Sequence, residues 1–321
     1  MSKSEKPVAI VTGSSRGVGA STAIKLSKHG WNVTITCSSS EKAAVEVSKE
    51  CQALGAETLV IKSDVSEEKN CKNVVEETIT KWKRLDALVN NAGTTKFNAH
   101  DNLSGLSAED FLRLYSVNTV GPYMMLKEAQ PFLLESPNPS VVNVGSIAGV
   151  TGIGSSIAYA SSKGALLNMT KSLARALGPI RVNAVCPGFI QGDWLRNGLG
   201  DEVYEALKEA TEKATPLALT VTADQVADSI LYFVEDAVTT TGETTMASNT
   251  DIARKRRKLE EEAAGRGTTV SGPTVKTIEQ VGGRGVGQVA AGTGQISSSE
   301  TQQVGTNLAT QQPDEQVTTV D

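Results

Sequence analysis

The sequence predicts an α/β domain in which helices cover both faces of a doubly wound, parallel sheet of seven strands. Two observations carry this prediction. Short apolar runs alternate with longer helical stretches without a break before residue 248, and the first apolar run leads straight into a glycine-rich turn. A chain of 321 residues could hold one large domain of this kind or two smaller ones. The unbroken alternation favours one domain, residues 1–249, followed by a polar tail, residues 250–321.

Each predicted strand is a short apolar run of the kind that is buried in a parallel sheet. The predicted strands are Val8–Thr12, Asn32–Cys37, Thr58–Ser63, Ala87–Asn90, Ser140–Val144, Arg181–Val185 and Glu243–Ala247. The predicted helices are Ala20–His29, Glu41–Leu54, Glu67–Trp82, Ala108–Leu134, Ser156–Leu177, Asp201–Ala214 and Ala223–Glu235. Right-handed crossovers between such strands place a ligand site at the carboxyl ends of the strands.

The turn after the first strand has the composition of a phosphate-binding loop. Gly13, Gly17 and Gly19 follow Thr12 directly, and a helix comes next. Backbone N–H groups and the positive end of that helix would point at a phosphate, and glycine allows the close approach that a Cβ would block. A glycine-rich turn can also be an ordinary loop, but its place after the first strand favours a dinucleotide site.

Tyr159 and Lys163 are four residues apart and so share one face of a helix. An ammonium beside a phenol favours the phenolate and lowers the pKa of the tyrosine from about 10. A tyrosine tuned in this way can protonate the alkoxide that develops when a hydride attacks a carbonyl. Taken alone, the spacing also occurs in ordinary surface pairs, so its weight comes from the glycine turn and from Ser146 upstream.

With these motifs in order, the chain resembles the short-chain dehydrogenase/reductase family over about residues 7–247. Three further segments carry the resemblance: Asn90–Gly93 after a strand, Asn118 within Val-Asn-Thr-Val-Gly, and Pro187–Ile190 after another strand. Within the family, the chain is most similar to the carbonyl reductases of the 3-oxoacyl-(acyl-carrier-protein) reductase type. The resemblance implies a Rossmann-type fold and hydride transfer with a nicotinamide cofactor.

The resemblance also implies a role for each catalytic residue. Tyr159 is expected to be the general acid, and Ser146 to hold the carbonyl oxygen. Lys163 is expected to bind the nicotinamide ribose and lower the pKa of Tyr159, and Asn118 to hold a water in a proton relay to Lys163. The implied cofactor contacts are Gly13, Ser15, Arg16, Gly17, Val18, Gly19, Ser38, Ser39, Asp64, Val65, Asn91, Ala92, Gly93, Tyr159, Lys163, Pro187, Gly188 and Ile190. No metal is expected.

The end of the second predicted strand favours NADPH over NADH. An NAD site places a carboxylate there for the ribose 2′-hydroxyl, but here Ser38–Ser40 follow the strand and the first acid is Glu41. Serine hydroxyls and the nearby Arg16 can instead hold a 2′-phosphate. The serines can also serve simply as the start of the next helix, with Ser39 or Ser40 as its cap, and both roles are compatible.

The substrate is less closely defined. By resemblance, residues 191–214 should cover the active site, and Trp194 and Leu195 either line an acyl or alkyl pocket or pack this segment onto the core. Gln191–Asp193 stand where many relatives have a threonine that contacts the nicotinamide carboxamide. Around residues 134–140, before the strand that leads to Ser146, there is an acid and no base for an acidic carrier protein. A general ketone reductase therefore competes with a 3-oxoacyl thioester reductase.

These observations predict an NADPH-dependent enzyme that reduces a ketone or a 3-oxoacyl thioester to the alcohol. One alternative is an NADP(H)-binding regulatory protein whose tail engages a partner. Another is an NAD-dependent alcohol dehydrogenase that works in the oxidative direction. The family often forms homotetramers through the last strand and the turn after it. Because residues 241–249 begin as in the family but lack its Asp-Gly-Gly-like turn, a homodimer is the alternative.

Several other features narrow the class of protein. The first residues lack the apolar core of a signal peptide, and no run of about 18 apolar residues exists, so we expect a cytoplasmic protein without a membrane partner. A net charge of −5 gives no reason to expect nucleic-acid binding by the domain. The four cysteines have no metal-ligand spacing and are expected to be reduced packing residues. His29 is expected to cap a helix, and His100 has no evident role.

The tail, residues 250–321, contains no aromatic residue and no cysteine and is rich in Gly, Thr, Gln, Ser and Val. Too little apolar surface is available to offset an ordering entropy of about 1–2 kcal/mol per residue, so we expect disorder apart from a helix at residues 252–264. Basic residues 254–258 could act as a nuclear-import signal or contact a polyanion, although such runs are more often a solvated helix face.

Overall fold

The computed structural model describes residues 4–247, and within them the sheet has the predicted class. Seven strands, all parallel, lie in the order β3-β2-β1-β4-β5-β6-β7. They are β1 (Val8–Val11), β2 (Asn32–Cys37), β3 (Thr58–Lys62), β4 (Ala87–Asn90), β5 (Ser140–Val144), β6 (Arg181–Pro187) and β7 (Thr244–Ala247). The predicted tail, with its helix and its basic cluster, lies outside the described residues.

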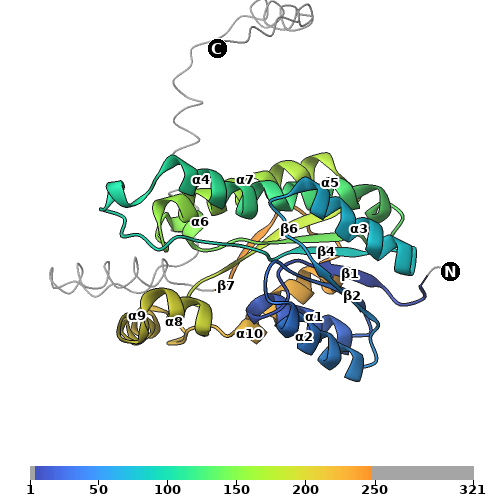
Figure 1. Ribbon diagram of the computed structural model, residues 1–321, viewed down its shortest axis with the longest axis horizontal. Helices are drawn as coiled ribbons and strands as arrows, with labels where there is room; N and C mark the ends of the chain where they lie inside the picture. Colours follow the sequence, from blue (N-terminus) through green and yellow to red (C-terminus); the bar gives the residue numbers. More distant parts are fainter. Residues whose placement is uncertain (1–3, 248–321) are drawn as a thin grey trace, which may run out of the picture. The chain divides into compact units, whose positions relative to one another are not determined.

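Helices cover both faces of the sheet (Figure 1). On one face lie α1 (Gly17–Lys28), α2 (Glu41–Ala53) and α10 (Ala223–Leu231). On the other lie α3 (Glu68–Trp82), α4 (Ala108–Tyr115), α5 (Gly121–Leu133) and α7 (Ile157–Ala176). The remaining helical segments are η1 (Leu103–Gly105), η2 (Ser116–Val120), α6 (Ala148–Thr151), α8 (Asp193–Leu199), α9 (Asp201–Ala214) and η3 (Tyr232–Asp236). None of the helices within residues 4–247 is long and apolar enough to cross a bilayer.

The apolar run of β1 is continuous because the strand is buried on both faces. Ala9 and Val11 belong to the core beneath α1 and α10, whereas Val8 and Ile10 belong to the core beneath α3 and α5. All four side chains are fully buried. A strand with helices on both sides has no solvent face, so its sequence shows no alternation of polar and apolar residues.

The predicted helix over residues 108–134 is wrong as a single element. The chain forms α4, then the π-helical segment η2, and then α5. Pro122 has no N–H to donate to the carbonyl of Asn118, four residues earlier, so the regular hydrogen-bond ladder cannot continue there. The irregular turn therefore falls on Asn118, which the sequence had marked as a site residue.

Other differences are smaller, and most boundaries agree within one residue. The first helix begins at Gly17 instead of Ala20, so the glycine turn is shorter than predicted. In the last predicted helix, the α-helical part ends at Leu231, and the chain continues as the π-helical segment η3. Two short helices, α6 and α8, were not predicted, and β6 runs two residues further, to Pro187.

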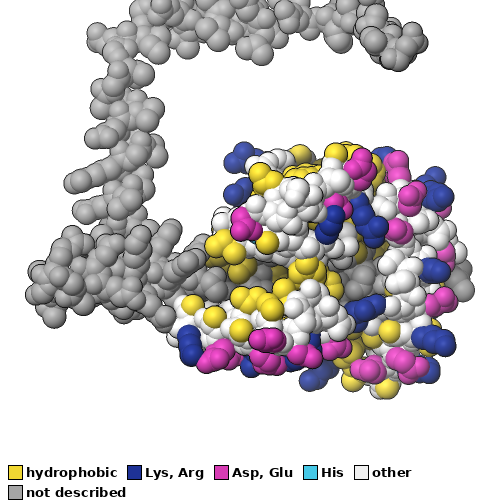
Figure 2. All heavy atoms as spheres, turned by 60° about the vertical axis from the view of Figure 1, so that its left-hand side comes forward, with side chains coloured by type: hydrophobic (Ala, Val, Ile, Leu, Met, Phe, Trp, Pro, Cys, Tyr) yellow, Lys and Arg dark blue, Asp and Glu magenta, His cyan; other side chains and the backbone are white. Residues whose placement is uncertain are grey.

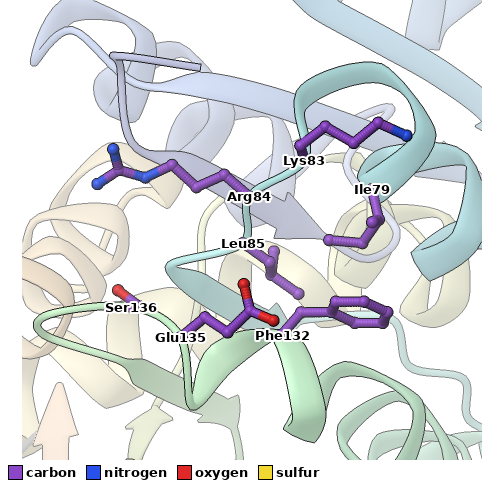
Figure 3. A pocket seen from close by; sticks show the side chains of 7 residues that line it. All are labelled: Ile79, Lys83, Arg84, Leu85, Phe132, Glu135 and Ser136. Atoms are coloured by element: carbon purple, nitrogen blue, oxygen red, sulfur yellow. The ribbon is translucent and has the colours of Figure 1, made fainter. Parts of the chain in front are cut away.

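A small surface hollow lies between the ends of α3 and α5. It is lined by Ile79, Lys83, Arg84, Leu85, Phe132, Glu135 and Ser136 (Figure 3). Leu85 precedes β4 and Ser136 precedes β5, so the hollow lies at the amino ends of the strands. Residues 134–140 therefore do not border the predicted active-site edge. The expectation that a missing base here disfavours a carrier protein therefore concerns a surface at the opposite ends of the strands from Ser146.

Candidate active site

The glycine turn packs against the end of β4 so closely that only glycine fits at two positions. Gly13 has a φ of +61°, and a Cβ there would lie 2.9 Å from Cα of Ala92. A Cβ on Gly19 would lie 2.6 Å from the carbonyl oxygen of Gly13. At Gly17, where α1 begins, nothing lies within 4 Å of the Cβ position. The first turn of α1 contains no acidic residue, so its positive end is open to an anion.

Thr12 and Asn91 hold this turn in place. The Thr12 hydroxyl oxygen accepts hydrogen bonds from the backbone N–H groups of Asn91 and Ala92, both at 3.0 Å. The Asn91 side-chain amide donates to the carbonyls of Thr12 at 2.9 Å and Gly13 at 3.0 Å. The structure therefore gives Asn91 a structural task in addition to the predicted place beside the cofactor. Sequence reasoning missed Thr12, although it directly precedes Gly13.

Arg16 lies beside the serines that follow β2. Its guanidinium donates a hydrogen bond to the hydroxyl of Ser40, and Ser38 and Ser39 are exposed next to it. Ser40 is the residue before α2, as the capping alternative proposed, but its side chain makes no capping hydrogen bond. A cation and hydroxyl groups thus meet at the point where a ribose 2′-substituent would bind.

The predicted cofactor residues line one edge of the sheet. Asp64 and Val65 follow β3, Ala92 and Gly93 follow β4, and Gly188 follows β6. Asp64 is exposed and accepts hydrogen bonds from the N–H and hydroxyl of Ser66 through a single carboxylate oxygen. The glycine turn, the amino end of α1 and the carboxyl ends of these strands lie along the same edge. This arrangement fits an extended dinucleotide.

Ser146, Tyr159 and Lys163 meet at the same edge, Ser146 after β5 and the other two on α7. Burial raises the pKa of Tyr159, and hydrogen bonding with the Ser146 side chain lowers it only in part. The net shift in the pKa of Tyr159 is therefore opposite in direction to the one expected from Lys163 alone. Removal from water favours the neutral phenol more than the neighbouring groups favour the phenolate.

Lys163 is almost fully buried, with 3% of its surface exposed. Its Nζ donates a hydrogen bond to the carbonyl of Val144 at 2.8 Å and lies 5.9 Å from the centroid of the Tyr159 ring. Burial lowers the pKa of Lys163 to about 8. Near neutral pH the lysine is thus close to the point at which it can exchange a proton.

Asn118, in η2, ties the loop after β4 to α7. Its Oδ1 accepts from the N–H of Thr94 at 2.8 Å, and its Nδ2 donates to the carbonyl of Thr94 at 2.9 Å and to the hydroxyl of Ser162 at 3.0 Å. A Cβ on Gly93 would lie 3.4 Å from Asn118 Oδ1 and 3.5 Å from Lys163 Nζ. Sequence reasoning missed Thr94 and also Ser162, although Ser162 lies within the Tyr-Ala-Ser-Ser-Lys motif.

One aromatic ring lies against Tyr159, and a second lies behind it. The ring centroid of Trp194, in α8, is 6.4 Å from that of Tyr159 and 5.9 Å from that of Phe97. Trp194 therefore contacts the predicted catalytic tyrosine and is half-exposed, while Leu195 is half-buried. Phe97 was missed because it lies in a polar loop without a recognisable motif.

The remaining chemistry-bearing residues lie elsewhere or are buried. All four cysteines are buried free thiols, and burial raises the pKa of Cys186 to about 11. His29 is the C-cap residue of α1 and pairs with Glu235 at 2.8 Å, and His100 lies 3.0 Å from the carbonyl oxygen of Gly154. Within residues 4–247, no three His, Cys, Asp or Glu residues gather in a way that could hold a metal ion.

Fold and site together define an oxidoreductase of the dinucleotide-binding class. A family model described as enoyl-(acyl carrier protein) reductase matches residues 13–249. The chain is 38% identical over 237 residues to ketoacyl reductase 2 of the granaticin polyketide synthase from Streptomyces violaceoruber, covering 74% of this chain and 92% of that protein. A 3-oxoacyl-[acyl-carrier-protein] reductase of Staphylococcus aureus is 32% identical over 71% of this chain and 90% of its own length. The chain belongs to the short-chain dehydrogenase/reductase family, whose members bind a nicotinamide cofactor.

Two solved structures are similar to the chain. A short-chain dehydrogenase/reductase from Burkholderia xenovorans superposes with a TM-score of 0.70 at 36% identity, over 76% of this chain and 97% of that one. NAD+-bound xylitol dehydrogenase shares the fold, with a TM-score of 0.69 at 23% identity over 75% of this chain and 97% of its own.

Proposed function

We propose that the protein is an NADPH-dependent reductase that converts a ketone or 3-oxoacyl compound to the corresponding alcohol. The observation that carries this proposal is the meeting of Ser146, Tyr159 and the buried Lys163 at the sheet edge that also holds the glycine cradle. The names of the two curated relatives, both ketoacyl or 3-oxoacyl reductases, support carbonyl reduction as the reaction.

The residues have complementary tasks in this reaction. The glycine turn and Arg16 hold the cofactor phosphates, and Ser146 donates a hydrogen bond to the carbonyl oxygen. NADPH, when bound, supplies the hydride that adds to the carbonyl carbon and is itself oxidised to NADP+. As the C=O π bond breaks, Tyr159 donates its phenolic proton to the oxygen, and the product is the alcohol. Lys163 then supplies the proton that restores the phenol, and solvent replenishes the lysine.

Consumption of NADPH in the presence of a carbonyl compound tests the proposal. We expect its absorbance to fall with at least some members of a panel of ketones and acetoacetyl thioesters, with one alcohol formed for each NADPH oxidised. Tight binding of NADPH without turnover on any compound would instead favour a regulatory protein.

The Arg16→Ala variant should lose most of the preference for NADPH. A charge-assisted contact to a 2′-phosphate disappears, while NADH has no such phosphate, so the ratio of kcat/KM values for NADPH and NADH should fall by roughly 10–100-fold. Steady-state kinetics with both cofactors measure the ratio. Arg175→Ala, at an exposed position in the last turn of α7, is the matched control and should leave it unchanged. An equal loss with both cofactors would contradict a 2′-phosphate contact.

The pH dependence of kcat/KM for reduction should follow the protonation of Lys163. Reduction consumes a proton, and this residue is protonated only below its pKa of about 8. We therefore expect kcat/KM for reduction, which reflects the free enzyme, to be constant below that pH and to fall about tenfold per pH unit above it. Thermal melts across the same range separate this loss from unfolding. A profile that stays flat well beyond that pH would contradict a proton supply through Lys163.

A further inference from the structure

The segment over Tyr159 presents a large, partly exposed aromatic ring beside the reacting hydroxyl. Trp194 is 49% exposed, and its ring is tilted by 48° against Tyr159 and by 52° against Phe97, within the distance range of favourable aromatic contacts. A half-exposed indole next to a catalytic group offers a flat apolar wall to whatever carbonyl compound reaches that group.

The two rings of this wall are held in place by the fold. A Cβ on Gly198 would lie 2.0 Å from Cε2 of Phe97, so α8 packs its glycine directly on the phenylalanine ring. At the base of the segment, the hydroxyl of buried Tyr204 accepts from the N–H of Gly192 at 3.2 Å, and its ring packs on Phe189. These contacts fix α8 at both of its ends, so the fold holds the rings of Trp194 and Phe97 in position beside the site.

Exposed apolar side chains also lie just before Gly154, which packs beside Tyr159. Val150 and Ile153 are 51% and 59% exposed, and a Cβ on Gly154 would lie 3.4 Å from Cδ1 of Tyr159. Figure 2 shows hydrophobic side chains gathered across the middle of the face seen there. A substrate that fills this surface buries apolar area, which favours binding by about 25 cal/mol per Å².

The charges around the site do not suit an acidic partner. Residues 193–214 carry six carboxylates and three bases. Each of these bases is paired: Arg196 with Asp201 and Glu205, Lys208 with Glu212, and Lys213 with Glu209. Across the site, Lys96 is paired with Asp110 at 2.6 Å. An acidic acyl-carrier protein would meet net negative charge here, which slows and weakens association.

From the cluster of aromatic rings and the net negative charge of residues 193–214, we infer that the substrate is a ketone that is not attached to a carrier protein. It has an aromatic or flat apolar group that packs against Trp194 and Phe97. This inference rests on the proposed function and narrows its substrate. It assigns Trp194 as a residue that determines specificity, acting through contact with the substrate.

Two compounds that differ in one group test the inference. Ethyl 3-oxo-4-phenylbutanoate and ethyl acetoacetate differ by one phenyl ring, which in the first compound is separated from the reacting ketone by a CH2 group and is not conjugated with it. We expect kcat/KM to be about tenfold higher for the phenyl compound, the ratio that an aromatic contact of about 1.4 kcal/mol gives. Trp194→Ala should bring the ratio close to one, and Trp194→Phe should retain most of it. Leu217→Ala changes an exposed residue in the same segment between β6 and α10, and this variant should behave as wild type.

Binding gives a readout independent of turnover. Ethyl 3-oxo-4-phenylbutanoate should quench tryptophan fluorescence, and the quenching should vanish in Trp194→Phe, because Trp31 and Trp82 are buried elsewhere. Equal kcat/KM values for the two esters, or unchanged quenching in the variant, would overturn the inference. So would a strong, salt-sensitive preference for acetoacetyl-carrier protein over the N-acetylcysteamine thioester. Quenching without NADPH consumption on any of these compounds would overturn the proposed function but not the aromatic site.

Discussion

Tyr159→Phe is expected to lower kcat for carbonyl reduction by roughly 10²–10⁴-fold, the range for loss of a general acid. The variant removes one oxygen and keeps the ring, so the packing with Trp194 is retained. The affinity for NADPH should change little, because the glycine cradle and Arg16 lie on other elements of the sheet edge. Steady-state consumption of NADPH measures kcat, and a fluorescence titration measures cofactor binding.

Tyr123→Phe is the matched control, because this tyrosine is exposed on α5, outside the catalytic residues. It should retain full activity. If Tyr159→Phe were equally active, proton delivery by Tyr159 would have to be abandoned. A joint loss of turnover and of NADPH binding would show that the substitution had damaged the fold of the site.

Gly19→Ala should weaken NADPH binding by about 10–100-fold and destabilise the domain. The added Cβ would lie 2.6 Å from the carbonyl oxygen of Gly13 and 2.8 Å from Cα of Ser14, and these backbone atoms cannot move without opening the cradle. Overpacking of this kind costs about 1–3 kcal/mol, which corresponds to a fall in Tm of roughly 2–12 °C for a domain of this size. A thermal melt and a cofactor titration measure the two effects.

Gly178→Ala provides the comparison, because nothing lies within 4 Å of the Cβ position there. Its Tm and its affinity for NADPH should stay close to those of the wild type. A Gly19→Ala protein with wild-type NADPH affinity would mean that the tight turn does not contact the cofactor phosphates.

Much of the fold could be predicted because the signals for it are local. A strand buried on both faces, such as β1, reads as an apolar run, and α9 begins and ends where the sequence predicted. The break at Asn118 also had a local cause, the missing N–H of Pro122, but the apolar pattern continues through it. Periodicity alone therefore predicted one helix where the chain forms three segments.

The candidate site was predicted less completely, because its connections join segments far apart in the chain. The links from Asn118 to Thr94 and Ser162, and the contact of Phe97 with Trp194, leave no mark in sequence spacing. Residues 134–140 are close to Ser146 in the chain, but β5 separates them from the active-site edge, which the sequence spacing does not reveal.

The class of fold, the glycine turn and the candidate residues Ser146, Tyr159 and Lys163 can be predicted from the chain alone, because each depends on residue types at short spacing. How these groups ionise and what they contact depends on tertiary packing. Proximity of Lys163 predicted a lower pKa for Tyr159, yet burial raises it and brings the pKa of Lys163 itself to about 8. Burial depends on every element packed around a group, and so does the aromatic wall beside Tyr159.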